Sequence, residues 1–484
     1  MQYKWTVLTV TTVGVLMSGI DSRIVVIGLP TVAAALHADA EQAIWFTQAY
    51  IIGSTVALLY LGRISDMVGR VRVYNLGFAI FTVGSLFTSL SPSPNFFIAA
   101  RIFQGLGSAA LFSNSAAIIT DAFPRGELGN ALGINSIAFR AGSMFGLTLS
   151  GLILAFFSWP FLFYVNIPVG IFGTIWAHKR LHEQSEPERT AKMDWPGFIT
   201  FALFMTFLLL ALTYAAYGIG ETTLIVGFAV LSAAFLVVFV RGEQRRADPL
   251  LDFGLLRIHE YLGGVIAQLI NTMAWGALFL MLSLYFQLVQ GYSPLQAGIA
   301  IIPFDLSLLA VGPLSGRLSD RFGTRPFTTA GLIVVTISIL AFSTLTVTTS
   351  YSTLVAFLLL GGGGMGLFVS PNFSSIMGAV PSHRRGVASA LRATFFNIGF
   401  VLSFNIVILV LTFYLPYSLI TSIISSQATG LASQGSRALF AGALDNVFIV
   451  LAVINTVAII PSLLRGKRLE IEPAVEAAHR AEPE

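Results

Sequence analysis

The stretch Gly62-Arg-Ile-Ser-Asp-Met-Val-Gly-Arg70 recurs 254 residues later as Gly316-Arg-Leu-Ser-Asp-Arg-Phe-Gly323, and each copy lies between long apolar runs. Hydrophobic residues make up 55% of the chain and charged residues only 10%, whereas a soluble protein carries about 25% charged residues. The mean hydropathy is +0.82. This composition predicts a polytopic membrane protein, and the repeated pattern predicts that it contains two copies of one unit.

The apolar segments predict an all-α membrane protein. A spanning helix needs about 20 mainly apolar residues, and fourteen segments meet that requirement. The N-terminal segment is expected to be the first span and not a signal peptide, because it exceeds the usual apolar length and contains Asp21. The predicted spans are centred near residues 18, 52, 81, 110, 143, 169, 206, 231, 274, 305, 336, 363, 400 and 453.

The basic residues predict the orientation of these spans. An even number of spans places both termini on one side, and the segments on that side hold 22 of the 27 Lys and Arg residues. The opposite side holds Arg437 alone, and the other four arginines lie inside spans: Arg23, Arg101, Arg140 and Arg392. Because cytoplasmic loops are enriched in Lys and Arg, we expect a plasma membrane protein with both termini in the cytoplasm.

The repeat also predicts the domain organisation. The segment from Gly105 to Pro124 aligns with that from Gly362 to Pro381, so spans 1–6 and 9–14 are expected to be two six-helix bundles. The predicted boundaries are residues 1–181 for the first bundle, 182–258 for a linker with two inserted helices, 259–465 for the second bundle and 466–484 for a cytoplasmic tail. Parallel six-helix repeats are typical of transporters with a substrate site between the halves.

Five segments carry a family resemblance. They are Asp21-Ser-Arg-Ile-Val-Val-Ile-Gly-Leu-Pro30, the loop 62–72, Arg101-Ile-Phe-Gln-Gly-Leu-Gly107, residues 159–170 and residues 284–298. Together they resemble the major facilitator superfamily and, within it, the fourteen-helix drug:proton antiporter family. The resemblance implies proton-driven export of amphipathic compounds by alternating access of the two halves.

The fifth span resembles the antiporter motif of that family only in part. Gly133, Gly142, Gly146 and Gly151 match its glycines, but Leu147 replaces a proline and Ser150 replaces a glycine. The small residues are expected to let another helix approach closely, and helix packing alone is an alternative to a role in antiport.

Three ionisable residues are candidates for proton coupling. Asp305 lies midway along a span, about 15 Å from water at 1.5 Å per residue, where its carboxyl can gain and lose a proton. Asp21 and Arg101 are implied by the resemblance, Arg101 as the motif arginine of the fourth span. The alternatives are a structural pair of Asp305 with a buried arginine and a structural pair of Arg101 with Asp21.

Two arginines are candidate substrate ligands. Four intramembrane arginines against two aspartates favour an anionic or zwitterionic substrate, bound by Arg23 or Arg140. Arg23 has the alternative of extending to the membrane surface, and that is the expected behaviour of Arg392. The other candidates are the aromatic residues Trp45, Tyr50, Trp275, Phe279 and Phe304, and the amides Gln48, Asn135, Asn271, Asn372 and Asn397, for which hydrogen bonding between helices is the alternative.

The repeated loops are predicted to gate the cytoplasmic face. Their carboxylates are expected to pair with basic residues and to hold that face closed, while their glycines make tight turns. The residues concerned are Gly62, Arg63, Asp66, Gly69, Arg70, Gly316, Arg317, Asp320 and Gly323.

The leading hypothesis is a proton-coupled exporter of amphipathic organic compounds, and the alternative is a transporter for one organic anion or zwitterion. We expect no enzymatic activity, no cofactor, no bound metal and no nucleic-acid partner. The chain has no cysteine, and it has no phosphate-binding glycine loop with Lys-Ser/Thr. Membrane lipid, a small-molecule substrate and protons are the expected partners of a monomer, and residues 418–437 are expected to form a long external segment.

Overall fold

The computed structural model describes residues 3–184, 194–217, 222–245, 253–380, 385–416 and 434–465. Within these ranges every regular element is a helix. The tail from 466 to 484 lies outside the described residues, and so does the external segment 418–437, except for its last four residues, which begin the final helix.

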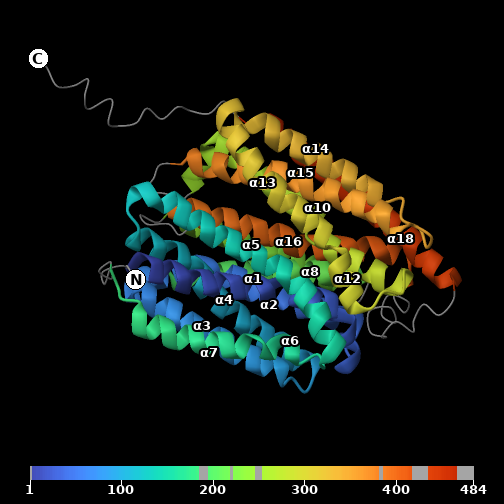
Figure 1. Ribbon diagram of the computed structural model, residues 1–484, viewed down its shortest axis with the longest axis horizontal. Coiled ribbons are helices and arrows are strands. Elements are labelled where there is room, and N and C mark those ends of the chain that lie inside the picture. The colour runs from blue at the N-terminus through green and yellow to red at the C-terminus, as the bar shows by residue number, and fades with distance from the viewer. Residues whose placement is uncertain are drawn as a thin grey trace, which may run out of the picture.

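The helices form two groups, which we call the N-terminal half and the C-terminal half (Figure 1). The N-terminal half comprises α1 (Tyr3–Ala35), α2 (Ala40–Val68), α3 (Arg70–Ser89), α4 (Pro94–Ala122), α5 (Arg125–Phe156), α6 (Phe161–Tyr164) and α7 (Asn166–Arg180). The C-terminal half comprises η1 (Phe253–Arg257), α10 (His259–Trp275), α11 (Leu278–Leu284), η2 (Tyr285–Val289), α12 (Pro294–Ala300), α13 (Ile302–Phe322), α14 (Thr324–Phe342), α15 (Tyr351–Gly378), α16 (Arg385–Tyr414) and α18 (Gln434–Leu463).

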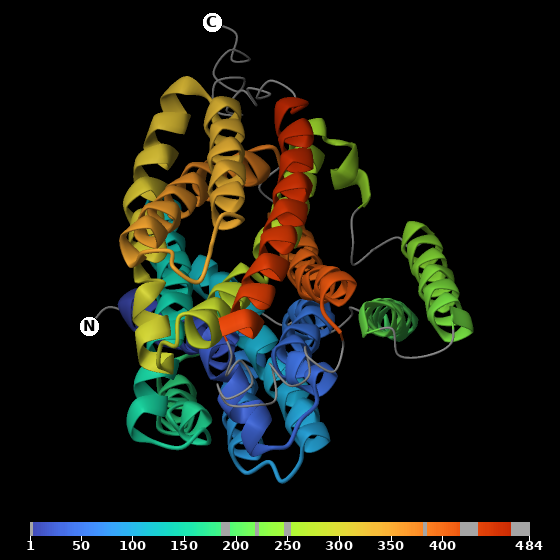
Figure 2. The same cartoon turned by 90° about the vertical axis from the view of Figure 1, so that its right-hand side faces the viewer.

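Two further helices, α8 (Trp195–Tyr217) and α9 (Thr222–Gln244), pack against each other beside these halves. Figure 2 shows them in green at one side of the molecule. α8 contacts both halves: Thr213 donates to the amide oxygen of Asn405 on α16 at 3.4 Å, and Phe198 packs against Tyr60 of α2. The pair thus lies where α2 and α16, from opposite halves, meet.

The prediction of fourteen apolar spans is confirmed. Thirteen helices are long and apolar enough to cross a membrane, and α2 is the fourteenth if its two segments, bent by 48° near Leu58, count as one span. Several spans are broken where the sequence analysis expected continuous helices. The span near residue 305 divides at Ile301 into α12 and α13, and the span near 274 ends in the π-helical turn η2.

Small residues set the spacing of α1 and α5. A Cβ atom at Gly142 would collide with the carbonyl oxygen of Leu16, and one at Gly146 with that of Ile20. Gly151 instead lies against Pro294 and Leu295 of α12. The first two glycines therefore hold α1 against α5, and Gly151 holds α5 against the C-terminal half.

Only two of the four predicted loop glycines form turns. Gly69 ends α2 with φ 119°, and Gly323 ends α13 with φ 88°, a backbone region that glycine occupies without steric cost. Gly62 and Gly316 lie inside those helices, so the prediction that they form turns is wrong.

Candidate transport site

A fully buried charge network lies inside the N-terminal half. Arg101 of α4 donates to the Asp21 carboxylate of α1, to the Gln104 side chain at 2.7 Å and to the carbonyl of Phe46 at 3.2 Å. Gln104 donates to the other Asp21 oxygen at 2.9 Å, and so does Asn166 at 2.8 Å. Asp21 and Arg101 expose no surface, so each charge is neutralised by its partner within one half.

Tyr50 belongs to the same network. Its ring lies 4.4 Å from the Arg101 guanidinium, and its hydroxyl donates to Ser108 at 2.7 Å. The structure therefore brings together Asp21 and Arg101, two proton-coupling candidates, with Tyr50, a substrate candidate. The sequence analysis missed Gln104 and Asn166 as members, and also Ser85, which accepts from the Gln104 side chain at 2.7 Å. Gln104 and Asn166 lie in the family-like segments 101–107 and 159–170, so the resemblance could have identified both. Ser85 could have been found as a polar residue in an apolar helix.

A second group of candidates meets where the two halves face each other. Arg23 of α1 lies with its guanidinium 4.4 Å from the ring of Phe279 in α11. It also interacts electrostatically with Asp305 of α13. The alternative of Arg23 extending to the membrane surface is therefore not favoured, because its contacts are with the other half.

Three aromatic rings pack together next to Arg23. Trp275 stacks on Phe304 at 4.8 Å between ring centroids, and Phe279 meets Phe304 edge-on at 5.1 Å. All three side chains are buried, as is Asp305. Asp305 sits in the first turn of α13, directly after the break at Ile301, and a helix N-terminus favours a neighbouring negative charge. The helix break is thus what places a carboxyl among apolar rings.

Arg140 and Arg392 form a third group. Arg140 lies on α5 and Arg392 on α16, and their charges interact unfavourably across the two halves. Arg392 donates to Gln268 of α10 at 3.3 Å and lies 4.9 Å from the ring of Phe373. The expectation that Arg392 extends to the membrane surface is wrong, because these contacts hold it against α10 and α15.

Most of the candidate amides bond between helices. Asn135 donates to Ser115 of α4 at 2.9 Å, and Asn271 donates to Asn455 of α18 at 2.8 Å. Asn372 donates to the carbonyl of Gly264 at 3.3 Å. These bonds favour the helix-packing alternative. Asn397 is half-buried, and Gln48 is fully buried with neither side-chain polar atom bonded.

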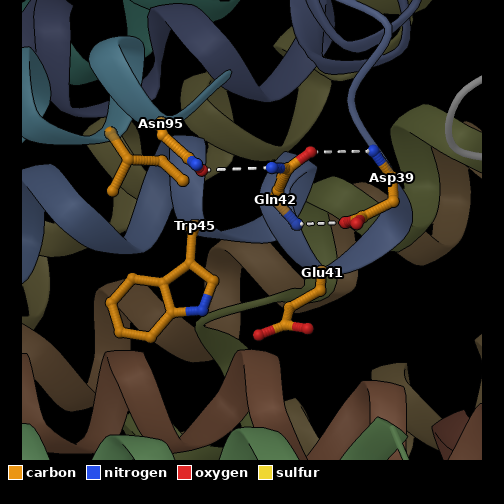
Figure 3. Close-up of a pocket in the computed structure, with 6 residues that line it drawn as sticks. Asp39, Glu41, Gln42, Trp45 and Asn95 are labelled. Atoms are coloured by element: carbon orange, nitrogen blue, oxygen red, sulfur yellow. Dashed lines mark hydrogen bonds between the residues drawn. The ribbon is translucent and has the colours of Figure 1, made fainter. Parts of the chain in front are cut away.

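Trp45 lies apart from the aromatic group around Phe304. It lines a shallow hollow of about 380 Å³ between the start of α2 and the start of α4 (Figure 3). Asp39 caps α2 there by accepting from the Gln42 backbone at 2.8 Å, and the Gln42 side chain donates to Asn95 at 3.1 Å. Trp45 is therefore placed near the start of α2, beside the first residues of α4.

The two repeated loops differ. Arg70 forms ion pairs with Asp66 at 3.0 Å and with Asp121 of α4 at 2.7 Å. Arg317 and Asp320 are exposed, and no ion pair involves them within the described part of the chain. Arg63 likewise has no ion pair there. The Arg70 pairs join elements of the N-terminal half only, and the gating role of the two loops at the cytoplasmic face stays a prediction.

A buried cluster at the end of the C-terminal half was missed. Arg465, just after α18, donates to the Asn372 side chain, and Ser375 donates to the Glu260 carboxylate at 2.8 Å. Burial lowers the pKa of Arg465 to about 10, and Glu260 opposes that shift. A lone arginine beyond the last span resembles any other cytoplasmic cation in the sequence, so nothing marked it as buried.

Metal ligands do not gather anywhere in the described ranges: no group of three His, Asp or Glu side chains is close enough to hold an ion. The buried charges are instead of two kinds. Asp21 and Arg101 form an ion pair within one half, whereas Arg23 and Asp305 face each other from different halves. This arrangement can exchange a proton at a carboxyl and bind a small amphipathic molecule beside aromatic rings, which are functions of a secondary transporter.

Comparison with known proteins gives the family. The model of the Major Facilitator Superfamily matches residues 11–404, so the chain belongs to that superfamily of membrane transporters. It is 33% identical over 402 residues to the riboflavin transporter RibZ of Clostridioides difficile, covering 83% of this chain and 87% of the relative. It is 31% identical over 417 residues to the multidrug resistance protein Stp of Mycobacterium tuberculosis, covering 85% and 76%.

Solved structures agree on the fold. A bacterial homologue of the human lysosomal transporter Spinster, in an inward-facing and unoccupied conformation, superposes with a TM-score of 0.66. The match covers 96% of this chain and 97% of that one at 16% sequence identity. The major facilitator fold expected from the resemblance is confirmed.

Proposed function

We propose that this transporter couples proton movement to the export of amphipathic organic compounds. The observation that carries the proposal is that Arg23 of one half lies close enough to Asp305 of the other half for their charges to attract each other. Arg23 lies on the ring of Phe279, which packs edge-on against Phe304, the residue that precedes Asp305. A charge and a titratable carboxyl at the same interface give one place where a proton and a substrate affect each other.

The physical argument is electrostatic. Opposite charges attract strongly where water is scarce. Ionised Asp305 on α13 and Arg23 on α1 therefore draw the two halves together where these helices face each other. A proton on Asp305 removes that attraction and changes the relative free energies of the two access states. Alternation between the states then carries the proton one way and the substrate the other.

The aromatic group defines the substrate class. Trp275, Phe279 and Phe304 offer flat apolar surfaces, while Arg23 offers a cation near them. A molecule with a ring system and a polar or negative group fits both. Export of several such compounds is the proposal favoured by relatives that include a multidrug resistance protein.

A second candidate function is transport of one specific solute. The relative named as a riboflavin transporter supports it, because riboflavin is a flat, amphipathic ring system. The four arginines inside the spans outnumber the aspartates Asp21, Asp305 and Asp445, which favours an anion or a zwitterion for such a specific carrier.

We also propose the membrane arrangement. The 22 basic residues on one side of the predicted topology support a plasma membrane location with both termini in the cytoplasm. The halves, divided near residues 181 and 259, are proposed to move as units, with the 182–258 segment as a linker, in a protein that acts as a monomer.

Transport in proteoliposomes tests this proposal. Purified full-length protein is reconstituted, a pH gradient is imposed, and movement of tetraphenylphosphonium, pyrenebutanoate and riboflavin is followed with and without competing compounds. Gradient-driven transport with mutual competition supports the exporter. Saturable transport of a single probe supports the specific carrier. Transport that is indifferent to the gradient would contradict proton coupling.

A further inference from the structure

Two arginines from opposite halves approach each other without a neutralising acid. Arg140 lies near the middle of α5, and Arg392 lies in the second turn of α16. Their guanidinium groups are near enough to interact electrostatically, and the interaction is repulsive. Neither forms an ion pair with any described carboxylate. Such an arrangement is costly inside a membrane protein.

Arg140 is turned toward the other half. Gly142 and Gly146 mark the face of α5 that lies against α1. Residues two apart on a helix point about 200° around the axis from one another, so Arg140 projects away from α1. Because Arg392 belongs to α16, the interaction between the two charges crosses from one half to the other.

The protein satisfies the N–H donors of the Arg392 guanidinium only in part. A guanidinium carries five N–H donors, and among the residues that the structure describes Arg392 has one acceptor, the Gln268 side-chain oxygen. Its Nε is buried and has no hydrogen-bond partner. The ring of Phe373 covers one side of the guanidinium at 4.9 Å. A buried, unsatisfied donor costs free energy, and an oxygen anion would remove that cost.

We propose that Arg140 and Arg392 together bind the carboxylate or phosphate group of an amphipathic ligand. Arginine suits this role because its planar fork matches two oxygen atoms of an anion. The anion would neutralise the repulsion between the arginines and connect α5 to α16. The nearby ring of Phe373 supplies apolar surface for the rest of the molecule. That the ligand is the transported solute rests on the proposed function, whereas the binding site itself does not.

The test is a binding measurement that needs no proton gradient. Full-length protein in phosphatidylcholine nanodiscs is titrated with pyrenebutanoate and with its neutral methyl ester. The wild type is expected to bind the acid at least about tenfold more tightly than the ester, since a charge-assisted hydrogen bond contributes about that factor. Arg140→Gln and Arg392→Gln should each lose about tenfold for the acid and keep their affinity for the ester.

Three controls make the result specific. Arg180→Gln removes an exposed cation at the end of α7 and should leave both affinities unchanged. Unaltered ester binding shows that each variant is folded. Arg140→Lys and Arg392→Lys, which keep the charge and lose the fork, should retain part of the preference for the acid.

The source of the anion is decided by lipid composition. If phosphatidylglycerol in the nanodiscs leaves acid binding unchanged, the site takes the anionic group of a solute. If phosphatidylglycerol displaces the acid in the wild type, the lipid headgroup is the ligand and the solute assignment is overturned. Equal binding of acid and ester by the wild type would overturn the site. Gradient-driven transport of tetraphenylphosphonium, measured separately, tests the proposed function, and its result does not depend on this anion site.

Discussion

Asp21 and Arg23 are two residues apart on α1, yet they belong to different parts of the molecule. Asp21 is turned into the N-terminal half, where Arg101, Gln104 and Asn166 bind its carboxylate. Arg23 is turned toward the C-terminal half, where it lies on Phe279 and near Asp305. Positions two apart on a helix diverge, so one helix serves both an internal network and the interface.

The difference separates structural charges from movable ones. Charges satisfied within one half keep their partners when the halves rearrange, so they stabilise the half in every state. Charges that meet across the interface must gain or lose partners as the halves move. The second kind is therefore where a proton or a substrate can bias the transporter.

The largest expected effect comes from breaking the internal network. Asp21→Ala leaves the buried Arg101 guanidinium without its anion, and removing one partner of a buried pair costs about 3–5 kcal/mol. We expect a strong loss of folded protein, measured as the free energy of unfolding in detergent. Arg23→Gln is the matched control two residues away and should change stability far less. Similar losses in both variants would contradict the comparison.

A smaller effect is expected where α1 rests on α5. Gly142→Leu places a side chain against the Leu16 backbone, and overpacking costs about 1–3 kcal/mol. A shift of α1 also moves both Asp21 and Arg23, so binding of pyrenebutanoate and stability should fall together. Gly133→Leu on the same helix, where nothing lies within 4 Å of an added Cβ, should leave both unchanged. Equal damage by the two substitutions would show that close packing at Gly142 is not the cause.

The smallest effect is expected at the repeated loops. Arg70→Gln removes two partly exposed ion pairs, each worth about 1 kcal/mol or less. Arg317→Gln removes an exposed cation without an ion pair and should have almost no effect on unfolding. A measurable loss for Arg317→Gln would mean that Arg317 has a partner in another conformation of the transporter.

Much of the fold was predictable because it depends on the length of the apolar segments and on the repeat in the sequence. Apolar length gave the fourteen spans, and the repeated pattern placed Gly69 and Gly323 at the two turns. The helix break at Ile301 had a signal that the sequence analysis did not use: Pro303 lies in the first turn of α13, and proline interrupts a continuous helix but is tolerated in its first turn. Side-chain partners were harder still, because they depend on helix rotation. The sequence marked Asp305 and Arg23 as candidates, but their meeting became visible only in three dimensions.

The repeat also concealed a difference between its copies. Both loops contain the same Asp and Arg pattern, but the second lacks counterparts for two partners. Arg70 and Asp121 form the N-terminal pairs, whereas Thr324 follows Gly323 and Gly378 lies 257 residues after Asp121. Comparing the residues at the positions of Arg70 and Asp121 in the two repeats, and not only the loop motif, would have predicted that the second loop forms no such pairs.

The central claim is that the carboxyl between the halves couples transport to protons. The most direct measurement is pH-gradient-driven transport of tetraphenylphosphonium and pyrenebutanoate in proteoliposomes containing wild type, Asp305→Asn or Asp305→Glu. We predict that Asp305→Asn remains folded and binds probe but loses gradient-driven transport, while Asp305→Glu regains part of it. Gradient-driven transport of equal rate in wild type and Asp305→Asn would contradict the claim.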